Sequence, residues 1–266
     1  MKPRHLAIGL IVVLAILAIV APWLAGDPYA AGLDGARLTA PSWHHLLGTD
    51  QFGRDVLARL GHGAQLSLGI AAMAIGLAAL LGLLFGVVAG GTHGPVAAVL
   101  SRVIDLALAL PRVVVLLVLV AVLGALGPVG LGLVLGATGW PAIARLTRGE
   151  ALMLRHAPFV TAARALGATP LRRLLREILP GTLPPVMVAA TLGVADVLLL
   201  EAGLSFLGIG IRPPTPTWGG MLLEAQPYLA SAPWLLLAPA AALVIATAAA
   251  TLAGDALRAR MRPEQE

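Results

Sequence analysis

The chain has 266 residues, of which 59% are hydrophobic and only 12% charged, an excess of apolar side chains that one soluble core could not bury. The formal net charge is +5, but only 4% of the residues are aromatic and no basic patch is interleaved with them, which argues against a nucleic-acid-binding protein. The absence of cysteine excludes disulfides, cysteine-ligated zinc and thiol catalysis. Composition therefore predicts an all-α membrane protein.

Six apolar segments are long enough to cross a bilayer, whose hydrocarbon core of about 30 Å needs roughly 20 helical residues. In chain order they cover 6–24, about 66–90, 103–124, 129–147, 185–211 and 233–254. The first segment exceeds the roughly 7–15 apolar residues of a signal peptide and is predicted to be a retained anchor. The predicted organisation is an anchor helix with an extracytoplasmic segment over 1–65, a five-helix core over 66–254 that contains a cytoplasmic loop at 148–183, and a cytoplasmic tail over 255–266.

The basic residues predict the orientation of these segments. The side that both termini share carries Lys2, Arg4, Arg102, Arg145, Arg148, Arg155, Arg164, Arg172, Arg173, Arg176, Arg258, Arg260 and Arg262. The opposite side carries Arg37, Arg54, Arg59 and Arg212, and Arg112 lies inside the third segment. Since cytoplasmic loops are enriched in Lys and Arg, both termini and the 148–183 loop are predicted to be cytoplasmic.

Several residues within the segments have local predictions. Pro111 should kink the third segment, where Asp105 could pair with Arg102 or Arg112. The glycines of the helices favour close helix packing. Three aromatic residues suit an interfacial belt: Trp218, Tyr228 and Trp234.

The loop between the fourth and fifth segments has the signals of two short helices. Pro158 suits a first helical position and Gly167 a left-handed C-terminal cap. Thr169 followed by Pro170 starts a second helix, which Pro180 is expected to end. The apolar residues of that second helix recur at three- and four-residue spacing: Leu171, Leu174, Leu175 and Ile178. An exposed apolar face in the cytosol predicts docking onto a partner; the alternative is a basic loop lying on anionic lipid.

The same loop resembles the "EAA loop" of binding-protein-dependent ABC importer permeases. The family pattern is Glu-Ala-Ala, three residues, Gly, nine residues, then Ile-x-Leu-Pro, and five residues match it: Ala162, Ala163, Gly167, Leu179 and Pro180. Thr161 replaces the usual Glu and Glu177 the usual Ile. Three more segments, 47–60, 201–219 and 254–258, resemble the dipeptide/oligopeptide/nickel branch, so the likeness covers 47–258 in the correct order.

The resemblance implies a type I ABC importer permease fold and a role as the C-type subunit. It also implies the partners, which are a second homologous permease, two ATPase subunits and an extracytoplasmic solute-binding protein, with the chain in the inner membrane. The loop would then be the coupling helix that contacts the ATPase, through Phe159, Thr161, Ala162, Ala163, Leu166, Gly167, Leu179 and Pro180. No cofactor is expected in this chain, because ATP would be bound by the partner subunits. Di- or oligopeptides are the implied cargo, with nickel or another small solute as the alternative.

Two acidic residues within the fifth segment are candidates for the translocation path. A charge at the centre of a spanning helix costs roughly 2.5–3.5 kcal/mol, so Asp196 and Glu201 either face water and cargo or form structural hydrogen bonds. Five residues of helix separate them by about 140°, which predicts different partners. The adjacent His44 and His45 lack an acidic partner at ligand spacing, so no metal site is predicted.

Two other classes of protein remain as alternatives. A single-chain secondary transporter would show inverted repeats, and none is evident. A membrane enzyme would need paired acids or histidines on facing helices, and Ser205 has no His/Asp constellation around it. Lys2 is the only lysine, so no phosphate-binding GxxxxGK[ST] loop can form and the chain is predicted to be a non-catalytic subunit.

Overall fold

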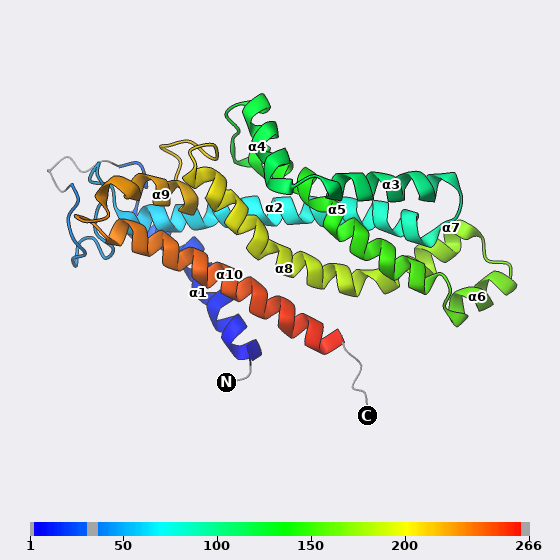
Figure 1. Ribbon diagram of the computed structural model, residues 1–266. Helices are drawn as coiled ribbons and strands as arrows, with labels where there is room; N and C mark the ends of the chain where they lie inside the picture. Colours follow the sequence, from blue (N-terminus) through cyan, green and yellow to red (C-terminus); the bar gives the residue numbers. More distant parts are fainter. Residues whose placement is uncertain (1–2, 31–36, 262–266) are drawn as a thin grey trace. The chain divides into compact units, whose positions relative to one another are not determined.

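The computed structural model describes residues 3–30 and 37–261, and its regular elements are helices, which confirms the predicted all-α class. Lys2 and Arg262, which entered the orientation argument, lie outside these ranges. The helices are α1 Pro3–Ala25, α2 Val56–Gly91, α3 Pro95–Ala109, α4 Arg112–Leu123, α5 Pro128–Leu154, α6 Pro158–Ala165, α7 Pro170–Arg173, α8 Leu179–Phe206, α9 Trp218–Ala225 and α10 Trp234–Met261 (Figure 1). A π-helical turn, Leu174–Ile178, joins α7 to α8.

Within the described ranges, four stretches of helix are long and apolar enough to cross a membrane, namely α2, α5, α10 and the stretch from α7 through α8. The bent pair α3 and α4 makes a fifth if it counts as one span. In α1 the apolar stretch, Ile8–Val20, is shorter. The chain is thus a multi-pass membrane protein in which each of the six predicted segments is helical.

Several helices extend beyond the apolar segments that predicted them. α2 begins ten residues before the predicted start at 66, α5 continues to Leu154, and α10 continues to Met261 through part of the predicted tail. Apolar composition marks the length of chain in contact with hydrocarbon, whereas helix-forming residues carry the helix into the polar stretches on either side.

The third predicted segment is not one straight span, which corrects the sequence-based expectation. α3 ends at Ala109, α4 begins at Arg112, and the two axes differ in direction by 85°. Pro111 lies in this break, where its missing N–H and its ring interrupt the helix, so the predicted kink is a complete corner.

The chain forms two compact units, each assembled from three stretches of sequence. The first comprises Met1–Ala72, Val120–Gly132 and Val194–Ala253. The second comprises Met73–Leu119, Leu133–Gly193 and Gly254–Glu266.

A glycine stripe on α2 organises the second unit. Gly82, Gly86 and Gly90 recur at four-residue spacing and lie against α5. A Cβ on Gly86 would stand 2.5 Å from Cβ of Thr147 and 2.6 Å from the carbonyl oxygen of Ala144, so only glycine allows this approach. The stripe confirms that these glycines serve close helix packing.

Candidate functional site

The loop after α5 begins with α6, whose two ends follow the predicted signals. Pro158 occupies the first helical position. At the other end the N–H of Gly167 donates to the carbonyl of Arg164 and the N–H of Ala168 donates to that of Ala163, both at 3.0 Å. Gly167 has a φ of +82°, so the pair of bonds forms a Schellman motif with glycine in the left-handed position. The predicted cap is confirmed.

The second helix of the loop starts as predicted but does not end at Pro180. The Thr169 hydroxyl accepts a hydrogen bond from the Arg172 N–H at 3.3 Å, with Pro170 at the first helical position. The chain then passes through the π-helical turn directly into α8, which contains Pro180 near its start. In that turn the N–H of Leu179 donates to the carbonyl of Leu174, five residues earlier. The π-helical turn accommodates Pro180 within a continuous helix, whereas the sequence had predicted that Pro180 ends the helix.

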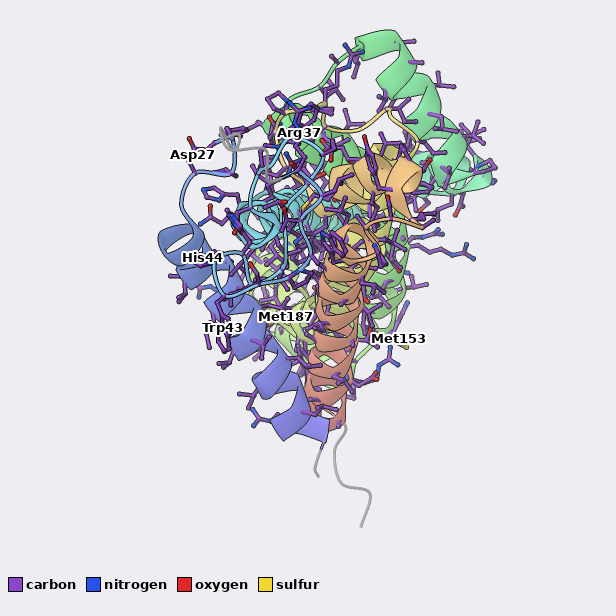
Figure 2. The ribbon with its side chains drawn as sticks, turned by 90° about the vertical axis from the view of Figure 1, so that its left-hand side faces the viewer. Asp27, Arg37, Trp43, His44, Met153 and Met187 are labelled. Atoms are coloured by element: carbon purple, nitrogen blue, oxygen red, sulfur yellow. The ribbon has the colours of Figure 1, made fainter. Side chains whose placement is uncertain are left out.

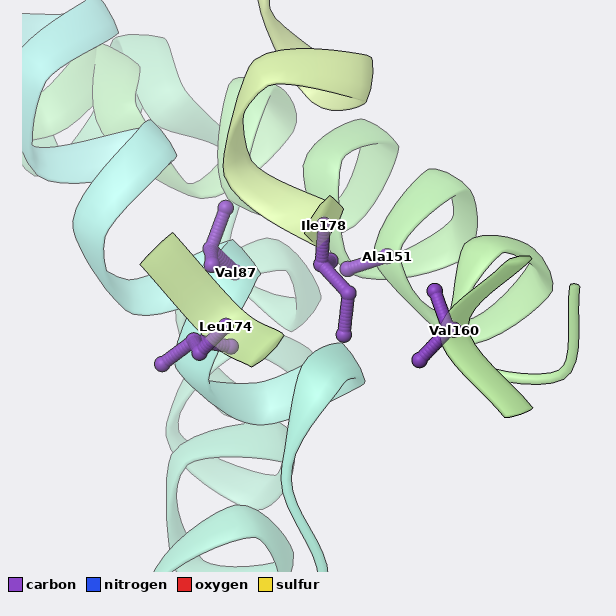
Figure 3. Packing of buried hydrophobic residues seen from close by; sticks show 5 residues of the cluster. All are labelled: Val87, Ala151, Val160, Leu174 and Ile178. Carbon is purple, nitrogen blue, oxygen red and sulfur yellow. The ribbon is translucent and has the colours of Figure 1, made fainter. Parts of the chain in front are cut away.

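A small apolar cluster anchors this loop on two membrane helices of the second unit (Figure 3). Val160 of α6, Leu174 and Ile178 are buried against Val87 of α2 and Ala151 of α5. The contact is close, because a Cβ on Gly91 would stand 2.5 Å from Cδ1 of Leu174. The inner face of the loop is therefore part of the packed core of its unit.

A hydrogen bond ties the end of α5 to the end of α2. Nη1 of Arg155 donates to the carbonyl oxygen of Thr92 at 2.8 Å, directly after the last turn of α2. This oxygen is one of the orphan acceptors at a helix end, so the arginine both caps α2 and holds the start of the loop.

The outer face of the loop is apolar and exposed. Phe159 is 49% exposed and Leu166 is 88% exposed, in an element whose other side is buried. Leu171 and Leu175 are also exposed, so the predicted apolar face of the second helix divides into an inner pair and an outer pair. The remaining predicted loop residues follow this division: Thr161, Ala162, Gly167 and Pro180 are exposed, and Ala163 and Leu179 are partly buried.

The two candidate acids of α8 lie in different environments, as their spacing predicted. Asp196 is exposed on the surface of the helix. Glu201 is fully buried, with its Oε1 accepting from the Ser205 hydroxyl at 2.9 Å and its Oε2 accepting from the Ser67 hydroxyl at 3.2 Å. The Ser67 bond joins α8 to α2 within the first unit, and the Ser205 bond lies within α8.

Trp218 completes the surroundings of Glu201 and corrects the interfacial-belt prediction. It is fully buried, its backbone N–H donates to the Ser67 hydroxyl, and its indole Nε1–H donates to the carbonyl of Leu60, both at 3.2 Å. Tyr228 and Trp234 are partly buried. Gly219 follows Trp218, and a Cβ there would lie 2.6 Å from Cα of Ala202, so α9 packs directly on α8.

Sequence reasoning missed a buried network of four charges in the first unit. Arg54 Nε lies 2.6 Å from Asp50 Oδ2, and Arg59 Nη2 lies 2.8 Å from Glu224 Oε2. Arg54 Nη2 also lies 3.2 Å from that Glu224 oxygen, and Arg59 Nη1 lies 3.4 Å from Asp50 Oδ2. The available signal was Arg59, a charge in the first turn of α2, but this helix was expected to begin only at 66.

Two smaller predictions concern groups outside these sites. The ion pair that Asp105 forms is with Arg148, Oδ1 to Nη1 at 3.6 Å, and not with Arg102 or Arg112 as expected. Arg148 reaches Asp105 from α5, whereas Arg112 lies beyond the 85° bend at the start of α4, where its Nη2 donates to the carbonyl of Leu135. His45 pairs with Asp55 at 2.7 Å, and His44 is exposed (Figure 2). In the described part of the chain no group of three or more His, Cys, Asp or Glu side chains could hold a metal ion.

Residues 82–264 match the family described as "Binding-protein-dependent transport system inner membrane component". The chain belongs to this family. The Di/tripeptide transport system permease protein DppC of Pseudomonas aeruginosa (strain UCBPP-PA14) is 36% identical over 264 residues, which cover 96% of this chain and 87% of the relative. The Dipeptide transport system permease protein DppC of Alkalihalophilus pseudofirmus is 35% identical over 269 residues, covering 100% and 88%.

Solved structures agree at the level of the fold of this permease family. An inward-facing structure of the MetNI methionine ABC transporter matches with a TM-score of 0.63 at 21% identity, covering 77% of this chain and 97% of that one. A second inward-facing crystal form gives 0.59 at 23% identity. The predicted type I importer permease fold is confirmed, and so is the predicted resemblance to binding-protein-dependent ABC importer permeases. As an ABC importer permease, the chain works with ATPase and solute-binding partners.

Proposed function

We propose that this permease forms half of a translocation path for di- and oligopeptides. The path would lie between this chain and a second homologous permease, with two ATPase subunits on the cytoplasmic side and a binding protein on the other. The relatives described as dipeptide and di/tripeptide permeases support the cargo, since they align over 96–100% of the chain. The Lys and Arg asymmetry supports an orientation with both termini in the cytoplasm.

The observation that carries the proposed coupling is the two-faced loop of α6 and α7. Val160, Leu174 and Ile178 fix its inner face to α2 and α5, while Phe159 and Leu166 stand exposed on the outside. Exposed large apolar side chains on a rigid element are typical of a surface that a partner covers. We assign that partner as the ATPase subunit.

The loop is connected directly to a membrane-spanning helix. α7, the π-helical turn and α8 are continuous, so a displacement of the loop is transmitted along the fifth span without an intervening flexible linker. Helix ends that move as rigid bodies can switch a transporter between two packed states. ATP binding and hydrolysis on the partner would therefore drive the cargo path through this connection.

We further assign different roles to the two acids of α8. Asp196 lies ten residues before the end of α8, which is about 15 Å along the helix axis, and its carboxylate is exposed. A charge on that face is costly against hydrocarbon, so the face is suited to the aqueous path between the two permeases. Glu201, enclosed by hydroxyl donors, is suited to holding α8 against α2 and α9.

The chain contributes no catalytic step in this scheme. With one lysine, at position 2, it has no phosphate-binding loop of its own, and nucleotide chemistry would belong to the partner subunits.

Co-purification of the ATPase with loop variants tests the coupling role. Leu166→Asp puts a charge on the most exposed apolar side chain of the loop and should abolish co-purification from detergent. Met153→Asp is the matched control, because Met153 is exposed on α5 outside the loop helices and should retain the ATPase (Figure 2). Retention by both variants would contradict the proposed interface.

Labelling of introduced cysteines tests the proposed orientation of the chain in the membrane. Because the chain has no cysteine, single cysteines can be introduced at Ala168 in the loop and at Ser42 in the segment before α2. A membrane-impermeant maleimide should label position 42 in intact cells and position 168 only after permeabilisation. The reverse pattern would contradict the assigned orientation.

A further inference from the structure

A polar pocket of about 500 Å³ lies where the end of α2, the first turns of α3 and the last turns of α5 meet, within the second unit. Three arginines line it, Arg102, Arg148 and Arg155, against a single carboxylate, Asp105. The Asp105–Arg148 pair is long, at 3.6 Å, and both side chains are partly exposed, so it neutralises little of this charge. The pocket is therefore electropositive.

One donor of a lining arginine has no acceptor, and the helix that begins at the pocket has no side-chain cap. The buried Nε of Arg155 has no hydrogen-bond partner among the described residues, although its Nη1 binds Thr92. Gly94, at the pocket wall, is the N-cap of α3 and provides no capping side chain, and the first turn of α3 contains no acidic residue. The positive dipole end of α3 thus adds to the charge of the arginines, and both would stabilise an anion bound in the pocket.

An apolar stripe on α3 borders the pocket at Arg102, which lies three residues after Val99 and four residues before Leu106 and is therefore next to both on the helix surface. Its exposed members recur at alternating three- and four-residue spacing, so they share one face of the helix: Val96, Val99, Val103, Leu106 and Leu110. The opposite face of α3 is packed in the protein through Ala97 and Ile104. A ligand that fills both features has an anionic head and long apolar chains.

We propose that the pocket is a binding site for an anionic glycerophospholipid. The headgroup phosphate would lie between Arg102, Arg148 and the start of α3, and the acyl chains would follow the stripe. Basic pockets between spanning helices at a membrane surface suit such headgroups. A free phosphate would leave the stripe unused, and an acidic segment of a protein would not match its length and apolar character. The proposal is independent of the cargo and of the coupling role of the loop.

Native mass spectrometry of the full chain, purified in detergent, tests the site with defined lipids. The wild type should retain phosphatidylglycerol in preference to phosphatidylcholine. The variant Arg102→Gln/Arg148→Gln should bind phosphatidylglycerol about 25-fold more weakly, since each cationic side chain near an anionic lipid contributes about fivefold. The control Arg172→Gln/Arg260→Gln removes the same charge from two exposed sites outside the pocket and should change binding less than twofold.

A second variant separates the pocket from general charge and from misfolding. Ala98→Phe fills the pocket from an exposed wall position while every charge stays in place, and it should also reduce phosphatidylglycerol retention. Equal losses in the pocket and control double variants, or full retention by Ala98→Phe, would overturn the proposal. Displacement of the lipid by millimolar inorganic phosphate would also overturn it and indicate a free-anion site. Loss of ATPase co-purification from the pocket variant, with lipid retention unchanged, would assign the pocket to a protein partner instead.

Discussion

Arg59 and Glu224 form an ion pair across 165 residues of sequence, with Nη2 of the arginine 2.8 Å from Oε2 of the glutamate. Arg59 lies in the first turn of α2 and Glu224 near the end of α9. The arginine side chain is only 2% exposed, and Asp50 and Arg54 complete the network around it. The pair fixes the start of α2 to the short α9 within the first unit, and Arg54 links the segment before α2 to the same glutamate.

Removing one member of this network should be severely destabilising. Arg59→Met would leave the carboxylates of Asp50 and Glu224 buried without enough cationic partners, at a cost of about 3–5 kcal/mol. Thermal unfolding in detergent should show a clearly lower Tm, whereas Arg212→Met, at an exposed position, should leave Tm unchanged. Equal Tm values for the two variants would mean that the network contributes nothing to stability.

The glycine stripe of α2 predicts a strong dependence on residue size. Gly86→Leu would force α2 away from Thr147 and Ala144 of α5, which should cost about 1–3 kcal/mol or more and lower the Tm of the purified chain. Gly76→Leu, on the same helix, is the control, because a Cβ at Gly76 meets nothing within 4 Å. The stripe would lose its assigned role if both variants unfolded at the same temperature.

Gly167 should be needed for the shape of the loop and not for packing. A Cβ at this position meets no atom within 4 Å, yet its φ of +82° costs an L-residue about 1–2 kcal/mol. Gly167→Ala should therefore weaken ATPase co-purification while Gly167→Asn retains more of it, because asparagine tolerates the left-handed region. The control Gly149→Ala, at an exposed helical position, should be neutral or slightly stabilising. Indistinguishable behaviour of alanine at 149 and 167 would contradict this account.

The two acids of α8 should separate transport from stability. Asp196→Asn removes an exposed charge, so it should reduce peptide uptake by the assembled importer without lowering Tm. Glu201→Gln places an amide donor against the Ser67 and Ser205 hydroxyls, and an unsatisfied buried donor costs about 1–3 kcal/mol, so it should lower Tm. The assignment is reversed if Asp196→Asn lowers Tm and Glu201→Gln affects uptake alone.

Sequence predicted the elements whose signals are local. Pro158, Gly167 and Thr169 mark helix ends by backbone chemistry that depends on a few neighbouring residues, and the structure places all three as expected. Apolar length likewise indicates the helical segments. The family motifs predicted the overall fold as well, because the order and spacing of motif residues are specific to a family and composition is not.

Features that depend on distant partners could not be obtained in this way. Pro180 was expected to stop a helix, and only the widened turn before it shows how α8 incorporates the residue. Tryptophan is common at membrane interfaces, so the sequence favoured that place for Trp218. Its burial depends on Leu60 and Ser67, which are more than 150 positions away in sequence. The pairing of Arg59 with Glu224 also depends on a distant partner, because neither charged residue by itself indicates which residue it pairs with.

Peptide uptake into proteoliposomes tests the central claim, that the exposed face of the α6 loop couples this permease to an ATPase. The assembled wild-type importer with its binding protein should accumulate peptide only when ATP is supplied to the ATPase side. The same importer carrying Leu166→Asp should lose that uptake, and the permease chain alone should show none. ATP-independent accumulation by the chain alone, or unchanged ATP-driven uptake by the variant, would contradict the account.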